Sequence, residues 1–243
     1  MSTNRNEHEI MHDRKILENP EAVWGRLGLA GKMRIERRAQ MIISSCKIGP
    51  GTRVLEVGCG TGALTEYLVK TGAEVVATDL FDRFLEIAKK KIVAPNVVFQ
   101  VANAEKMTDF ADESFDAVCG LSILHHLNLD LTLPSIHRIL KPGGRLAFAE
   151  PNMMNPQIAL QKNIPFIKKM AGDSPDETAF FRWRINRILT DYGFVEPNVL
   201  PFDYLHPVCP DFLAASMDKF GLFLEKIPVI KEIAGSVFIS AKK

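Results

Sequence analysis

The chain has 243 residues, of which 47% are hydrophobic and 24% are charged, and its formal net charge is +1. This length suits one elaborated domain, and the near-neutral charge gives no electrostatic support to a nucleic-acid partner. The four cysteines are scattered and form no CxxC pair, which argues against a zinc site and a disulfide framework and predicts reduced thiols in the cytoplasm. The polar N-terminal stretch does not resemble a signal peptide, and no run reaches the ~20 apolar residues of a membrane span.

From residue 51 onward, short β-rich runs alternate with helical patterns. This alternation predicts strands at 52–57, 74–79, 96–102, 115–121 and 145–150. It predicts helices at 63–72, 81–92 and 129–140, and a KPGG turn at 141–144. Apolar strands that alternate with helices predict a parallel sheet with right-handed crossovers. Later strands at 195–205 and 235–243 complete the expected α/β fold: a doubly wound, Rossmann-like, seven-stranded and mostly parallel sheet.

The flanking regions are expected to be caps over the carboxyl edge of this sheet. Residues 1–50 are predicted to form an N-terminal helical cap, and residues 51–150 the cofactor-binding core. Residues 151–243 are predicted to hold a lid insertion, the late strands and the C-terminal part of the same domain. Within them, helical patterns lie near residue 185 and at 211–228.

The stretch VLEVGCGTG at 54–62 follows the first predicted strand and precedes the first helix. Ligands of open α/β sheets bind beyond the carboxyl ends of the strands, and glycines there permit unusual backbone angles and close approach. Gly58, Gly60 and Ala63 satisfy the dinucleotide pattern GxGxxG/A, and Asp79 stands at the position of the ribose acid. An NAD(P)-linked oxidoreductase is therefore one hypothesis.

Glu56 separates the two ligand classes. A dinucleotide places an anionic pyrophosphate at the glycine turn, and a nearby carboxylate would oppose it. S-adenosylmethionine (SAM) has no phosphate but carries an ammonium and a sulfonium, so an acid beside the turn becomes favourable. The pattern therefore favours SAM over NAD.

Five segments in order carry a resemblance: VLEVGCGTG (54–62), TD (78–79), NAEKM (103–107), FDAVCGLSILHHL (115–127) and RILKPGGRLAFAEP (138–151). They resemble the class I SAM-dependent methyltransferases over residues 50–150. The nearest branch resembles the small-molecule enzymes of methyltransferase type 11, typified by the C-methyltransferases of quinone biosynthesis.

This resemblance implies a set of cofactor-binding residues: Glu56, Gly58, Cys59, Gly60, Gly62, Asp79, Leu80, Asn103, Ala104 and Leu121. The glycines and Leu121 would line the methionine moiety, with Glu56 near its ammonium. Asp79 would bind the ribose hydroxyls and Leu80 would pack on adenine, with Asn103 and Ala104 at the adenine edge. The family more often has aspartate where Asn103 stands, so that contact would lack charge assistance.

Methyl transfer from a sulfonium is an in-line displacement, in which positioning and exclusion of water supply most of the catalysis. A general base contributes where the acceptor must lose a proton. His125 and His126 after the fourth strand and Glu150 at the end of the fifth are the candidates, each also readable as a packing or hydrogen-bonding residue. Asp203, Tyr204 and His206 are secondary candidates, and no metal site is expected.

Features that are absent from the sequence narrow the acceptor. The fourth strand ends in CGLS, with no DPPY- or NPPY-type tetrapeptide of nucleic-acid N-methyltransferases, and Cys119 is expected to be a packed core thiol. A small organic acceptor remains, methylated at carbon, oxygen or nitrogen. A catalytically inactive SAM-binding regulatory protein is an alternative.

The caps add one hypothesis about this acceptor. Residues 158–170 and 212–230 are rich in Phe, Leu, Ile and Met, which suits an apolar, lipid- or quinone-like acceptor and peripheral membrane contact. Ordinary lid packing is the alternative reading. The stretch 24–38 is expected to close over SAM, with Arg34 or Arg38 near its carboxylate. The sequence does not specify an oligomeric state.

Overall fold

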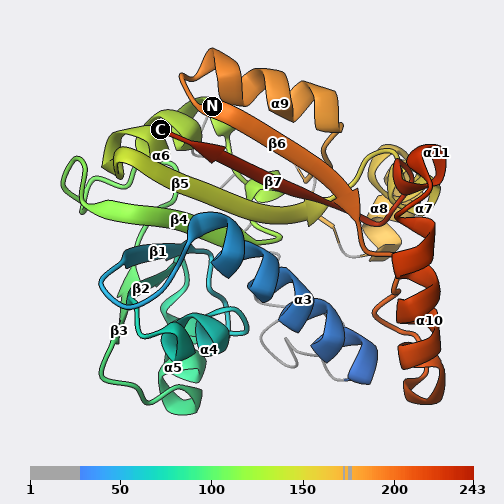
Figure 1. Cartoon of the computed structure of the whole chain (residues 1–243), viewed down its shortest axis with the longest axis horizontal. Helices are drawn as coiled ribbons and strands as arrows, with labels where there is room; N and C mark the ends of the chain where they lie inside the picture. The colour runs from blue at the N-terminus through green and yellow to red at the C-terminus, as the bar shows by residue number, and fades with distance from the viewer. Residues whose placement is uncertain (1–27, 172, 175–176) are drawn as a thin grey trace.

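The computed structural model describes residues 28–171, 173–174 and 177–243 (Figure 1). Residues 1–27 of the predicted N-terminal cap, and residues 24–27 of the stretch expected over SAM, lie outside the described residues. The described remainder of that cap forms one long helix, α3 (Leu29–Cys46).

A single seven-stranded sheet organises the chain, with the strand order β3-β2-β1-β4-β5-β7-β6. The strands are β1 (Arg53–Val57), β2 (Glu74–Asp79), β3 (Val97–Val101), β4 (Phe115–Leu121), β5 (Leu140–Pro151), β6 (Val195–Phe202) and β7 (Ser236–Lys242). β1 to β5 pair in parallel, and β7 runs antiparallel between β5 and β6. The predicted fold class is confirmed. Strand order reverses between β1 and β4, so ligands are expected beyond their carboxyl ends.

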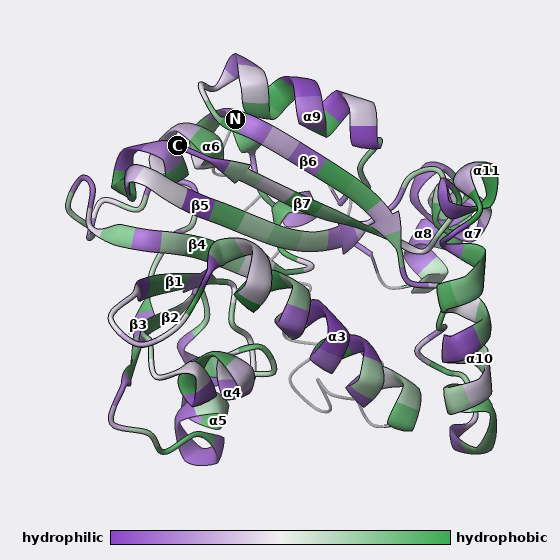
Figure 2. Cartoon of the chain, viewed as in Figure 1, coloured by the Kyte–Doolittle hydropathy of each residue, from purple (hydrophilic) through white to green (hydrophobic). Residues whose placement is uncertain are grey.

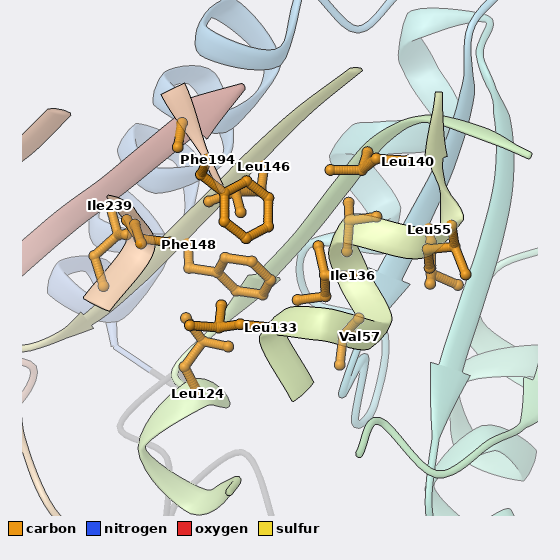
Figure 3. Packing of buried hydrophobic residues seen from close by; sticks show 14 of the residues in the cluster. Leu55, Val57, Leu124, Leu133, Ile136, Leu140, Leu146, Phe148, Phe194 and Ile239 are labelled. Carbon is orange, nitrogen blue, oxygen red and sulfur yellow. The ribbon is translucent and has the colours of Figure 1, made fainter. Parts of the chain in front are cut away.

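Helices cover both faces of the sheet. Besides α3, the helices of the described residues are α4 (Thr65–Leu68), η1 (Val69–Thr71), α5 (Asp82–Lys91), η2 (Leu124–His126), α6 (Leu129–Ile139), α7 (Pro156–Asn163), α8 (Pro165–Ala171), α9 (Arg182–Asp191), α10 (Asp211–Leu224) and α11 (Pro228–Lys231). On one face, α6 buries Leu133 and Ile136 against the strands (Figure 3), and Ile185 of α9 belongs to the same cluster. On the other face, α3, α4 and α5 bury Ile42, Leu68, Leu85 and their neighbours. Figure 2 shows hydrophobic colour along the central strands, as expected for a sheet covered on both sides.

Two local predictions are wrong. The KPGG turn at 141–144 is part of β5, which pairs through Leu140 with Phe115 and resumes at Arg145 after a register shift. Gly143 adopts φ +76° in this irregularity, so the glycine pair bends the strand instead of starting it. The helix predicted at 63–72 is reduced to α4 and η1, because residues 61–64 still belong to the turn after β1.

The cap helices α7, α8, α10 and α11 gather at one end of the sheet (Figure 1). α10 lies beyond the end of the sheet, and the N-terminal end of α3 runs out toward it (Figure 1), where the Leu29 N–H donates to Asp211 Oδ1 at 2.7 Å. None of the helices in residues 28–171, 173–174 and 177–243 has both the length and the apolar character to cross a membrane.

Candidate functional site

The turn after β1 contains three glycines with positive φ and hydrogen-bonds to the carboxylate of Asp79. Gly58, Gly60 and Gly62 have φ values of +66°, +54° and +84°, a region that side chains disfavour. Asp79, the last residue of β2, accepts hydrogen bonds from the Gly60 N–H at 2.8 Å and the Phe81 N–H at 3.0 Å. The glycine turn and the predicted ribose acid therefore form one unit.

The turn is also electrostatically negative. Glu56 is buried and accepts a hydrogen bond from the Thr65 hydroxyl at 2.6 Å. Burial raises the pKa of the Cys59 thiol, and the charges of Glu56 and Asp79 raise it further. The pKa of Asp79 is itself raised by burial, although backbone N–H groups oppose this shift. Two buried acids thus lie at the glycine turn, and their negative charge stabilises a cation there and opposes an anion.

Ile123 completes this turn, and the sequence did not single it out. A Cβ on Gly58 would lie 2.5 Å from Ile123 Cγ1, and a Cβ on Gly120 would lie 2.7 Å from Ile123 Cγ2. The missing side chains let the loop after β4 close onto the turn after β1. Gly120 stands inside the quoted CGLS, which is the signal that was available.

The residues assigned to adenine and methionine contacts lie along the same edge. Leu80 and Ala104 are half-buried, and Leu121 ends β4. Asn103 follows β3, which pairs with β2 through Asp79 and Val101. The side-chain oxygen of Asn103 accepts from the Glu105 N–H at 2.8 Å, so it shapes its own turn. The structure therefore brings the predicted cofactor residues to one edge, and it employs Asn103 in holding the loop.

A buried chain of charged groups lies behind the loop after β4. Glu150 accepts from the backbone N–H groups of Ile123 and Leu124, both at 2.9 Å, and lies 2.6 Å from His125 Nδ1. On the other side, His125 Nε2 is 3.4 Å from a Glu177 carboxylate oxygen. The separately predicted candidates His125 and Glu150 are thus adjacent, and Glu177, which sequence reasoning missed, contacts His125 from the other side. An isolated acid in a loop carries no sequence signal for such a contact.

This arrangement holds His125 as a cation. Burial lowers the pKa of the imidazole, but the hydrogen bonds and charges of Glu150 and Glu177 outweigh it and raise the pKa to about 9. A protonated imidazole cannot accept a further proton near neutral pH, so this geometry suits positioning better than general-base catalysis. His126 is half-buried, and its ring centroid lies 4.2 Å from that of His125.

Ligand atoms of His125, His126 and Glu177 lie within 4.8 Å of one another, a spacing compatible with one metal ion. Lys162 pairs with Glu177, and with Asp173 at 2.9 Å. The Lys162 ammonium thus already supplies positive charge at this carboxylate, and we assign no metal to the cluster.

The secondary candidates lie at the end of β6. Asp203 is 4% exposed and receives hydrogen bonds from Arg34 Nε at 2.9 Å and Arg38 Nη2 at 2.7 Å. The Tyr204 hydroxyl donates to the Ile230 carbonyl oxygen, and His206 Nε2 lies 3.2 Å from the Gln157 amide. Each of the three thus has its own partner, and none of these contacts involves His125.

Comparison with known proteins agrees with this geometry. Residues 55–148 match the family model described as a methyltransferase domain. The chain is 31% identical over 134 residues to a mouse protein named "Ubiquinone biosynthesis O-methyltransferase, mitochondrial", which covers 53% of this chain and 36% of that protein. It is 37% identical over 112 residues to a Tropheryma whipplei (strain Twist) demethylmenaquinone methyltransferase, covering 44% of this chain and 46% of the relative. The alignments thus span less than half of these two relatives.

Solved structures show the same fold. A SAM-dependent methyltransferase from Archaeoglobus fulgidus superposes with a TM-score of 0.62 at 18% identity, covering 87% of this chain and 94% of that one. The predicted resemblance is confirmed: residues 55–148 match a methyltransferase domain, relatives named as methyltransferases align with the same region, and the fold is that of solved SAM-dependent methyltransferases.

Proposed function

We propose that the chain is an enzyme that transfers a methyl group from SAM to a small organic acceptor by in-line displacement. The observation that carries this proposal is the pair of buried acids, Glu56 and Asp79, beside three left-handed glycines. Both acids suit the ammonium, sulfonium and ribose hydroxyls of SAM. The same negative charge opposes a pyrophosphate, which disfavours the NAD(P)-linked alternative.

We assign cofactor binding to the ten predicted residues: Glu56, Gly58, Cys59, Gly60, Gly62, Asp79, Leu80, Asn103, Ala104 and Leu121. For catalysis, we keep His126 as the residue for acceptor contact. We assign His125 and Glu150 to positioning, because both ring nitrogens of His125 face carboxylates and Glu150 holds the backbone of Ile123 and Leu124. Displacement from a sulfonium then depends on ordering the reactants and excluding water.

The acceptor class follows from the caps and the relatives. The apolar cap helices and two relatives named for ubiquinone and demethylmenaquinone methylation support an apolar, quinone- or lipid-like acceptor. The atom that is methylated stays open between carbon, oxygen and nitrogen. The described residues support a single domain in which α3, α7, α8 and α10 cap the core. Free cysteines at positions 46, 59, 119 and 209 support a cytoplasmic location.

A ligand-stabilisation experiment tests the cofactor. S-adenosylhomocysteine at 100 times its dissociation constant should raise the free energy of unfolding by about 2.7 kcal/mol, visible as a higher melting temperature. NADH in parallel should give no shift, and Asp79→Ala should abolish the shift with S-adenosylhomocysteine. Stabilisation by NADH alone would overturn the proposal.

Turnover separates the enzyme from an inactive SAM-binding protein. We expect S-adenosylhomocysteine release that depends on an added quinone or lipid acceptor. Cofactor binding without release for any acceptor, including slow automethylation, would support the regulatory alternative.

A further inference from the structure

Arg34, Arg38, Asp203 and Ser236 form a compact group, here called the arginine–aspartate cluster. Both guanidinium groups bond to the same oxygen of Asp203, and Arg38 Nη2 also donates to the Ser236 hydroxyl at 2.7 Å. Asp203 has φ +75°, outside the range that most side chains prefer, so the fold holds this carboxylate against local backbone strain. Strained residues that are held by several hydrogen bonds are common at functional sites.

The cluster holds more positive than negative charge. Two guanidinium groups share one carboxylate, whereas the neighbouring Arg37 is neutralised by Glu225 through two hydrogen bonds of 2.8 and 2.6 Å. Burial lowers the pKa of Arg34 to about 10, and the charge of Arg38 adds to this shift, while Asp203 offsets part of it. An anion placed at this cluster would complete the balance.

Arg34 presents its unused donors in a fixed orientation. Its Nε bonds to the buried Asp203, while its two Nη nitrogens make no hydrogen bond within the described part of the chain. The side chain is 18% exposed, so the fork is partly open to solvent. A planar guanidinium that is anchored through Nε offers both Nη groups to a carboxylate or phosphate.

The position of the cluster indicates which anion it binds. Asp203 follows β6, and Ser236 opens β7, which pairs with Pro151 of β5 at the carboxyl edge. β7 is three strands away from β1 in the sheet, or about 14 Å at a spacing of ~4.8 Å. A SAM molecule with its ammonium beside Glu56 keeps its own carboxylate near the glycine turn. The Arg34 guanidinium therefore lies on the side of the cofactor site where the methyl acceptor would bind.

We propose that Arg34, oriented by Asp203, binds an anionic group, a carboxylate or a phosphate, on the methyl acceptor. This inference rests on the proposed function and narrows it. The acceptor then combines an apolar body, which suits the cap helices, with one charged end at the arginine–aspartate cluster. The expectation that Arg34 or Arg38 meets the SAM carboxylate is the competing reading of the same chemistry.

Titration of the full chain with benzoate and with inorganic phosphate tests the subsite, at constant ionic strength and with S-adenosylhomocysteine both absent and saturating. We expect each probe to bind more tightly than chloride. Arg34→Met should weaken this binding at least about tenfold, because charge-assisted hydrogen bonds are lost. Arg34→Lys should recover part of it. Lys32→Met, which removes an exposed cation from the same helix, should leave it unchanged.

Affinity for S-adenosylhomocysteine distinguishes the two sources of the anion. We expect it to stay within twofold of wild type in every variant. A tenfold loss in Arg34→Met would assign the fork to the SAM carboxylate and overturn the proposal, as would probes that bind no better than chloride. A third outcome is that the protein binds anions through Arg34 but does not bind S-adenosylhomocysteine. That result would support the anion subsite and contradict the proposed methyltransferase function. Arg34→Lys answers the same questions if Arg34→Met does not fold.

Discussion

Gly58 shows how one missing side chain joins two strand ends. Its φ of +66° and the 2.5 Å approach of Ile123 Cγ1 to an added Cβ both exclude larger residues. Ile123 in turn is held by Glu150, which accepts from its backbone N–H. The glycine that opens the cofactor turn therefore also seats the loop that carries His125.

We predict that Gly58→Ala lowers the free energy of unfolding by about 2–4 kcal/mol, from overpacking and from left-handed backbone strain. Gly143→Ala is the matched control, since Gly143 has φ +76° and nothing within 4 Å of an added Cβ. It should lose only about 1 kcal/mol. Urea denaturation measures both. Equal losses would contradict the contact with Ile123, and a double-mutant cycle with Ile123→Ala should show coupling.

The buried His125 predicts a dependence of stability on pH. Its folded pKa of about 9 lies above the ordinary 6.5, so the folded state binds the proton more tightly. The stabilisation is fully present below about pH 6.5 and is lost as pH rises through about 9. This shift in the pKa of His125 contributes on the order of 3 kcal/mol to the free energy of unfolding. Glu150, Glu177 and Lys162 are the charged neighbours in this cluster.

Denaturation of wild type and His125→Gln across this pH range checks the prediction. The difference in unfolding free energy between the two should shrink between pH 6.5 and 9. A constant difference would show that His125 is neutral in the folded protein.

At the scale of elements, α7 and α8 are tied to the loop after β4 by charge. Lys162 of α7 is buried between Asp173 and Glu177, and Glu177 contacts His125. Phe166 and Met170 on α8 are exposed and contribute little to the core, so polar contacts such as this ionic chain hold the two helices.

We predict that Lys162→Met loosens α7 and α8 locally. The variant removes the ammonium from the buried Asp173 and leaves Glu177 with His125 as its cation, and breaking a buried ion pair typically costs about 3–5 kcal/mol. Amide hydrogen exchange should quicken in α7 and α8 while β1 and β4 keep their protection. Lys169→Met, which alters an exposed lysine on α8, should change neither. Uniform loss of protection throughout the sheet would mean that the ion pairs of Lys162 stabilise the whole fold and not α7 and α8 alone.

At the scale of the molecule, the cap end presents apolar side chains that the sheet does not cover. Phe212, Phe220 and Phe223 of α10 are more than half exposed, at 83%, 53% and 56%. α10 extends beyond the sheet, and α7, α8 and α11 lie together near the end of α10 that leads into α11 (Figures 1 and 2). With Lys169 and Lys219 also exposed, this end suits contact with an anionic bilayer, where an apolar acceptor would be found.

We predict that the protein co-sediments with anionic vesicles and that Phe212→Ser combined with Phe223→Ser weakens this association. The two side chains would otherwise bury apolar area in the bilayer interface. Val98→Ser is the control, since Val98 is 59% exposed on β3, at the far edge of the sheet. Failure of the wild-type protein to associate with the vesicles would contradict the sequence-based hypothesis of peripheral membrane contact.

Much of the core could be predicted because its signals are local. β2 and β4 begin and end at the predicted residues, since apolar strands between turns leave a continuous pattern. Glu56, Gly58 and Asp79 lie at the ends of adjacent strands, and any parallel sheet brings such ends to one edge. The bulged start of β5 was not predictable in this way, because a glycine pair reads as a turn until its pairing with Phe115 is known.

The sequence alone therefore determined the fold class, the glycine turn and the acid that selects its ligand, because each depends on residues a few positions apart or on strand ends that topology aligns. Only the tertiary structure decided that Glu177 meets His125 and that Arg34 meets Asp203, 169 residues away. A charged side chain has many equivalent partners in a sequence. Its real partner is set by how helices from both ends of the chain pack over one edge of the sheet.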